Sequence, residues 1–75
     1  MNTQAVWTDV VSQMIEQEGG RVVAHAQDGP TDASWQVEAG ERQGELTMAW
    51  QEGNPRRWLR ARRQVIRLVD ELYGD

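Results

Sequence analysis

The 75-residue chain contains no cysteine, no phenylalanine and no lysine, and it has a single histidine. Without cysteine, neither a disulfide nor a thiolate metal site can form, and one histidine excludes a site with several histidine ligands. The chain has no long apolar run, so no transmembrane helix is predicted. The N-terminus lacks the basic and apolar regions of a secretory signal. The expectation is therefore a cytoplasmic protein that needs no metal and no cofactor.

The sequence also lacks a recognisable catalytic constellation. His25 has no evident partner, and because it alternates with Val23 and Gln27 it is expected on the polar face of a strand. The glycines stand singly or in pairs at turns rather than in a phosphate-binding loop. The carboxylates are scattered along the chain. We therefore expect a protein without enzymatic activity.

What the sequence does contain is a strong separation of charge. Residues 1–55 hold nine acidic residues and two arginines, for a net charge of −7, whereas residues 56–75 hold six arginines and three acidic residues, for +3. A protein that is acidic as a whole is poorly suited to nonspecific nucleic-acid binding. A local basic surface can still bind a specific acidic patch on a partner.

The longest periodic segment predicts a helix over residues 55–73. Asn54 is a favoured N-cap residue, and Pro55 suits the first helical position. Gly74 is a natural C-terminal stop. At about 100° per residue, one side of this helix gathers an apolar stripe with Leu59 and Ile66 on its flank. The stripe consists of Trp58, Val65, Val69, Leu72 and Tyr73.

The opposite side of this helix carries a row of arginines spaced four, three and four residues apart: Arg56, Arg60, Arg63 and Arg67, with Arg57 beside them. The row crowds the N-terminal half, where the helix macrodipole favours anions, and its members repel one another at these spacings. Two explanations stay open. The chain's own carboxylates neutralise the row, including a local pair between Arg67 and Glu71, or an anionic partner does.

Arg62 projects into the middle of the apolar stripe. Either its stem packs on the core while its head reaches an acid, or a partner covers this face.

A first helix is predicted over residues 3–18, capped by Asn2 or Thr3, and it too could be covered either by the chain itself or by a partner. Its apolar arc spans about half of the helix, so it contacts both the sheet and the last helix, or it contributes to a homodimer. The arc consists of Val6, Trp7, Val10, Val11, Met14 and Ile15.

Three strands are expected between the helices, over residues 21–27, 34–39 and 45–51. Gly19-Gly20 ends the first helix, and residues 28–32 have the composition of a turn. Inward residues of the last two strands must oppose one another, which predicts an even-numbered loop, either Arg42-Gln43 or residues 41–44. The expected cross-strand pairs are Ala39–Leu46, Val37–Met48 and Trp35–Trp50.

These elements predict a single α+β domain over residues 1–75, in the order α-β-β-β-α. The three-stranded antiparallel sheet is expected to carry both helices on one face and to expose the other. The four tryptophans, Trp7, Trp35, Trp50 and Trp58, are expected in the core, where their N–H groups need partners. Trp58 is the strongest candidate for exposure and thus for a binding hot spot.

The order of elements resembles the double-stranded RNA-binding domain. Gly29-Pro30 follows the first strand as a Gly-Pro does in that family, and Arg56-Arg57-x-x-Arg60 is similar to the family's basic phosphate clamp. The resemblance implies RNA binding through the last helix. The chain departs from the family where Arg63, Gln64 and Arg67 replace small buried residues, and where Asp32 replaces a histidine.

The preferred hypothesis is a small non-catalytic protein-interaction module, such as a regulator, adaptor or inhibitor. It would bind a protein partner that carries an acidic patch. The alternative is nucleic-acid binding by the same arginine-rich helix, and no membrane association is expected. The residues assigned to partner binding are Arg56, Arg57, Trp58, Arg60, Arg63 and Arg67.

Overall fold

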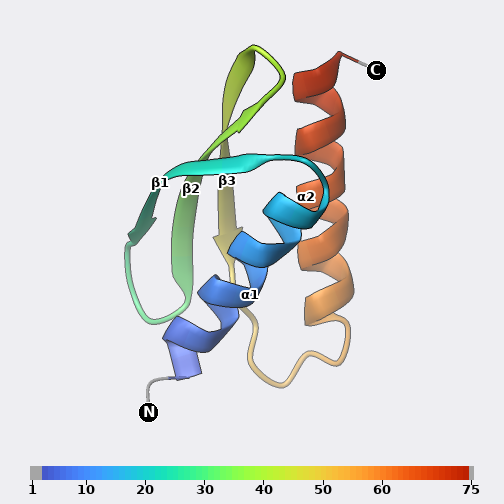
Figure 1. Ribbon diagram of the computed structural model, residues 1–75. Coiled ribbons are helices and arrows are strands. Elements are labelled where there is room, and N and C mark those ends of the chain that lie inside the picture. The colour runs from blue at the N-terminus through green and yellow to red at the C-terminus, as the bar shows by residue number, and fades with distance from the viewer. Residues whose placement is uncertain (1–2, 75) are drawn as a thin grey trace.

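The computed structural model describes the backbone of residues 3–74 and the side chains of residues 7–74. Three strands form one antiparallel sheet in the order β1-β2-β3, and two helices pack on it (Figure 1). This confirms the predicted α+β class and the α-β-β-β-α order. The elements are α1 (Thr3–Gln17), β1 (Arg21–Gln27), β2 (Asp32–Ala39), β3 (Arg42–Ala49) and α2 (Arg57–Tyr73). Asn2, a predicted cap of the first helix, lies outside the described backbone. Val6, predicted in the apolar arc of that helix, lies outside the described side chains.

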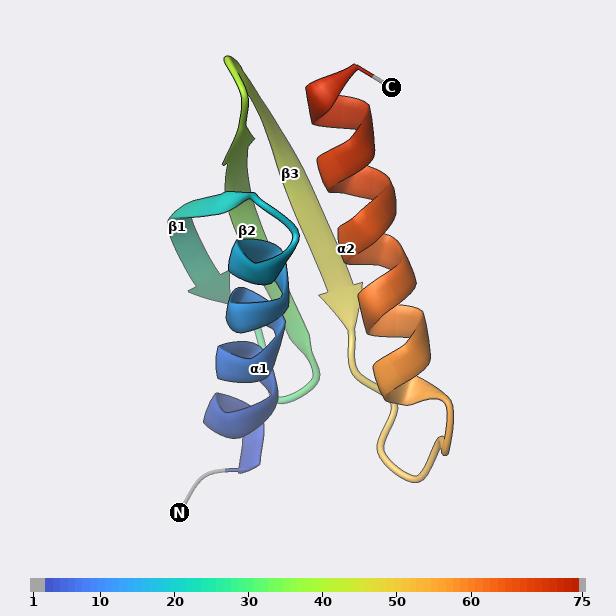
Figure 2. The same cartoon turned by 45° about the vertical axis from the view of Figure 1, so that its right-hand side comes forward.

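The two helices cover different parts of the sheet. In Figure 2, α1 lies in front of β1 and β2, whereas α2 lies beside β3 along its length. Leu68 and Leu72 of α2 approach Gly44 near the start of β3, while Ala61 lies near Met48 at its end. The helix therefore runs antiparallel to β3. No helix within residues 3–74 combines the length and the apolar character needed to cross a bilayer.

The core lies between the sheet and the helices. Fully burying one large apolar side chain contributes roughly 1.5–3 kcal/mol, so a core of this size can hold a short chain folded. Tyr73, expected in the buried stripe, is instead 50% exposed, although its hydroxyl donates to the Gly19 carbonyl oxygen at 2.6 Å. The buried apolar residues are Trp7, Val11, Ile15, Ala33, Trp35, Val37, Ala39, Leu46, Met48, Trp50, Ala61, Val65, Val69 and Leu72.

The predicted register of the β2–β3 hairpin is wrong by four residues. Trp35 opposes Leu46 rather than Trp50, and Ala39 opposes Arg42 rather than Leu46. The loop is the pair Gly40-Glu41, and Gly40 has a φ of +63°. A positive φ at only the first loop residue is typical of a type II′ hairpin turn. The loop has an even number of residues, as expected. The same residues of each strand therefore face the core as predicted, and only their cross-strand partners differ.

Gly44 lies inside β3 rather than in the turn, and α2 packs closely against it. A Cβ placed on Gly44 would lie only 3.1 Å from methyl carbons of both Leu68 and Leu72. The missing side chain thus lets α2 pack closely against β3. The third strand starts three residues earlier than predicted and ends at Ala49 rather than Gln51. The second strand likewise starts two residues earlier, at Asp32.

A bulge in β1 overturns the expected placement of His25. The pairing of β1 with β2 shifts between Val22 and Ala24, which leaves Val23 as an extra residue. His25 consequently opposes Trp35 and lies on the helix-covered face instead of the polar face. Its ring stacks on Trp35 with centroids 5.2 Å apart. His25 stays exposed, because β1 is at the sheet margin.

The first turn of α2 starts two residues later than predicted. The predicted N-cap is wrong, because Arg56 and not Asn54 occupies that position. Asn54 instead stabilises the preceding turn: its Oδ1 accepts the Arg56 N–H at 2.9 Å and its carbonyl oxygen accepts the Arg57 N–H at 3.1 Å. Pro55 and Arg56 form a turn ahead of the helix. The C-terminal prediction is confirmed: Gly74 has a φ of +85°, and its N–H donates to the carbonyl oxygens of Asp70 and Glu71.

Indole rings form a continuous chain through the core. Trp7 stacks on Trp50 at 5.0 Å and meets Trp35 edge-on at 5.9 Å, and Trp50 meets Trp58 edge-on at 4.6 Å. The Trp35 indole N–H donates to the Ser12 hydroxyl at 3.0 Å. The buried Trp7 Nε1 has no hydrogen-bond partner within the described part of the chain. Three of the four tryptophans are buried and Trp58 is partly buried.

Candidate partner-binding surface

The arginine ridge, which we define as Arg56, Arg60, Arg63 and Arg67, begins at the N-cap residue of α2 and continues along the outer side of the helix. All four side chains are exposed. Their spacing places them along one side of three helical turns, while Ala61, Val65, Val69 and Leu72 on the other side are buried. Packing against the sheet therefore orients the ridge away from the core.

No ion pair holds the ridge within the part of the chain whose side chains the structure describes. Across residues 7–74, no carboxylate oxygen lies within the 4.0 Å ion-pair distance of a ridge guanidinium. This includes Glu71, which is one turn from Arg67 and was considered as its partner. Repulsion between ridge members and with the helix dipole is therefore not relieved by pairs inside the described structure.

Arg57 is held differently from the ridge. Its guanidinium lies over the Trp50 ring, 5.5 Å from the centroid, and one terminal nitrogen donates to the Asn54 carbonyl oxygen at 3.1 Å. Its buried Nε has no partner within the described residues. These contacts give Arg57 a structural role at the start of α2 in addition to its charge.

Trp58 is not the exposed apolar residue of the helix. It packs against the core and contacts Trp50, whereas its neighbour Leu59 is 46% exposed. Leu59 lies four residues from Arg63, so the two side chains share one side of α2. Sequence reasoning placed Leu59 on the flank of the buried stripe, and the true centre of that stripe at Ala61 and Val65 explains its exposure.

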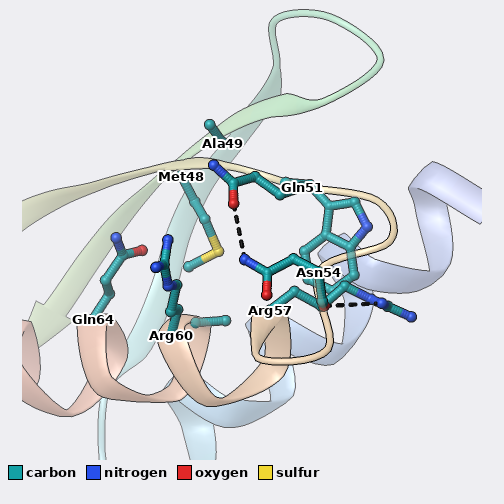
Figure 3. Close-up of a pocket in the computed structure, with 9 residues that line it drawn as sticks. Met48, Ala49, Gln51, Asn54, Arg57, Arg60 and Gln64 are labelled. Atoms are coloured by element: carbon teal, nitrogen blue, oxygen red, sulfur yellow. Dashed lines mark hydrogen bonds between the residues drawn. The ribbon is translucent and has the colours of Figure 1, made fainter.

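A cleft of about 220 Å³ lies where the end of β3, the loop after it and the first turns of α2 meet. Arg60 and Gln64 rise from α2 next to one another, and the amides of Gln51 and Asn54 lie on the loop side (Figure 3). Asn54 Nδ2 donates to Gln51 Oε1 at 2.9 Å. The cleft thus combines one unpaired guanidinium with several amides, a set that suits a carboxylate.

Sequence reasoning found Arg57 and Arg60 but missed the amides of the cleft. Gln64 could have been found, because it lies one turn from Arg60 on the same side of the helix. Gln51 could not, because it was predicted inside a strand. Arg63 and Arg67 lie outside the cleft, around a shallow hollow on the outer surface of α2 that Ile66, Asp70 and Glu71 also line.

Arg62 was predicted either to pair with an acid while its stem packs on the core or to be covered by a partner, and the structure matches neither prediction completely. Its side chain is exposed and lines a shallow hollow with Met14 and Gln17 of α1 and with Glu18, which follows that helix. Within residues 7–74 it forms no ion pair. Among those same residues, no group of three or more histidine and carboxylate side chains is placed to hold a metal ion.

Fold and surface together define a small α+β protein whose C-terminal helix exposes a row of arginines that form no ion pair among the described side chains. Comparison of the chain with protein-family models, with curated proteins and with solved structures gives no match. The functional argument therefore depends on the chemistry of this surface.

Proposed function

We propose that the protein is a small non-catalytic interaction module, a regulator, adaptor or inhibitor, that binds an acidic surface of a partner protein. The arginine ridge is the contact surface, with Leu59 as its exposed apolar neighbour. Arginine favours such a role because its planar guanidinium forms two parallel hydrogen bonds with a carboxylate. Arginine is also enriched in binding hot spots.

One observation carries the proposal: within residues 7–74 the ridge forms no ion pair, in a protein that is rich in carboxylates. The chain has twelve acidic residues against eight arginines, yet none of those described pairs with the ridge. Like charges at these spacings on one helix side, and those in the first turn that oppose the helix dipole, cost a few tenths of a kcal/mol each. A binding partner that supplies the missing negative charge accounts for this arrangement.

Charge reversal on the ridge tests the proposal. The Arg60→Glu/Arg63→Glu variant should lose capture of its protein partner from a nuclease-treated lysate, by about tenfold or more. The matched control is Arg21→Glu/Arg42→Glu, which changes the net charge equally at positions outside α2. Circular dichroism should show that both variants keep the fold.

Two results would count against this function. Equal capture by the ridge variant and the wild type would exclude the ridge as the contact surface. Loss of all capture after nuclease treatment, together with binding to purified duplex RNA that weakens steeply with added salt, would favour the nucleic-acid alternative.

A further inference from the structure

The open edge of β3 adjoins the cleft. β3 is the terminal strand of the sheet, spans eight residues and pairs with β2 without a bulge. In an antiparallel pair, backbone groups face the neighbouring strand at every second residue and face away at the others. The Trp50 N–H donates to the Thr31 carbonyl oxygen at 2.6 Å, which shows that even-numbered residues face β2. The residues that face away are Gln43, Glu45, Thr47 and Ala49.

Nothing within residues 3–74 forms backbone hydrogen bonds with this edge. An unpaired, regular edge is a template for another strand. Thr47 and Ala49, at the end next to the cleft, are small and uncharged. The one carboxylate in this stretch, Glu45, is already bonded to Gln36 at 2.8 Å and to Thr47 at 3.3 Å. The edge is therefore accessible to a further backbone.

The space beside this edge is basic. α2 runs alongside β3 (Figure 2), and the cleft joins Ala49 at the strand end to Arg60 and Gln64 on the helix. A strand added to β3 would lie about 4.8 Å from it, with alternate side chains directed toward α2. A carboxylate on such a side chain can reach the cleft, whereas a basic side chain there would be repelled by Arg60.

We propose that an extended acidic segment of a partner protein adds to β3 as a fourth strand and places a carboxylate against Arg60 and Gln64. The proposal rests on the protein-binding function above and specifies its ligand. Main-chain hydrogen bonds to the edge supply affinity, and the charged cleft supplies specificity. Binding of this kind requires no rearrangement of the sheet, because the edge and the cleft are already formed.

The probe is a synthetic octapeptide that alternates glutamate with valine, and the control peptide alternates lysine with valine. Each is titrated into the full-length, ¹⁵N-labelled protein. The acidic peptide should bind at least about tenfold tighter than the basic one. It should also slow the hydrogen exchange of the Gln43, Glu45, Thr47 and Ala49 amides, while exchange in β1 stays unchanged.

Two variants separate the edge from the ridge. Thr47→Pro removes one outward N–H without removing a bond to β2, and it should weaken acidic-peptide binding about tenfold or more. Arg60→Glu should do the same through the cleft. The control Arg62→Glu reverses one charge on the side of α2 that faces α1, outside both the ridge and the cleft, and should change the affinity by less than about threefold. If Thr47→Pro fails to fold, the exchange pattern of the wild type still decides.

Strand addition is overturned by equal affinity for the two peptides, by no binding at millimolar concentration, or by binding without protection of the edge amides. It is also overturned if the free protein is a dimer whose β3 amides are already protected, because the occupant is then a second copy. None of these results removes the proposed function, which fails separately if ridge reversal leaves partner capture unchanged.

Discussion

The two edges of the sheet are built differently. β1 contains the bulge at Val23, and all of its residues except Val22 are exposed. β3 is regular, buries Leu46 and Met48, and is flanked by α2. Proteins commonly protect an edge strand from unwanted pairing by bending it with a bulge. This protein does so at β1 and leaves β3 straight.

The difference indicates that one side of the molecule carries most of the stability and also the candidate binding surface. Elements with few buried contacts open at low free-energy cost, so β1 should be the least stable strand. The β2–β3–α2 side holds most of the core and supports both the arginine ridge and the cleft. A binding surface on rigid elements needs little ordering when a partner arrives, which favours affinity.

Truncation of a core residue in β3 should have the largest effect. Leu46→Ala removes a buried side chain that is 6% exposed and should lower the free energy of unfolding by about 2–5 kcal/mol. Val23→Ala in β1, where the side chain is 48% exposed, should change it by less than about 0.5 kcal/mol. Urea denaturation followed by tryptophan fluorescence measures both. Equal losses would show that the two edges contribute equally to stability.

Filling the space at Gly44 should have the next largest effect. Gly44→Val places methyl groups against Leu68 and Leu72, where even a Cβ would be only 3.1 Å away, and overpacking of this kind costs about 1–3 kcal/mol. Gly29→Ala is the matched control, because the nearest atom to its Cβ would be 3.8 Å away. The same denaturation midpoints test the pair. An unchanged midpoint for Gly44→Val would contradict the close packing of α2 on β3.

Gly44 also shows the limit of the sequence argument about the hairpin. Alternating apolar residues correctly predicted which side of each strand faces the core, because that depends only on the two-residue period. Gly40 and Gly44 bracket the turn region, and either could have supplied its flexible residue. The choice depends on Leu68 and Leu72, which are distant in sequence, so local patterns could not decide the register.

The candidate site was predictable to a similar extent. Helical spacing correctly placed Arg60, Arg63 and Arg67 on one exposed side of α2. The cleft was not predictable, because it needs the end of β3 and the loop around Asn54 to meet the helix. His25 was misplaced for a related reason: Val23 is a typical strand residue, and only the pairing with β2 reveals that it forms a bulge.

The smallest expected effect is the change in stability on charge reversal, which should have opposite signs for Arg60 in α2 and Arg21 in β1. Arg60→Glu puts a carboxylate in the first turn of α2, where the dipole favours it, and ends repulsion with Arg56 and Arg63. It should therefore stabilise the protein by about 0.5–1 kcal/mol while weakening partner binding. Arg21→Glu in β1 places a carboxylate opposite Glu38 and should destabilise it by about 0.2–1 kcal/mol.

Thermal denaturation at low salt measures this contrast, and added salt should shrink both changes, because screening weakens interactions between exposed charges. A destabilised Arg60→Glu variant would mean that Arg60 serves the fold, and the unpaired ridge would then no longer indicate a partner. A stabilised variant that has lost binding would show the opposite. The chain would then keep an arginine at a position where stability alone favours an acid, and the partner's charge would be the reason.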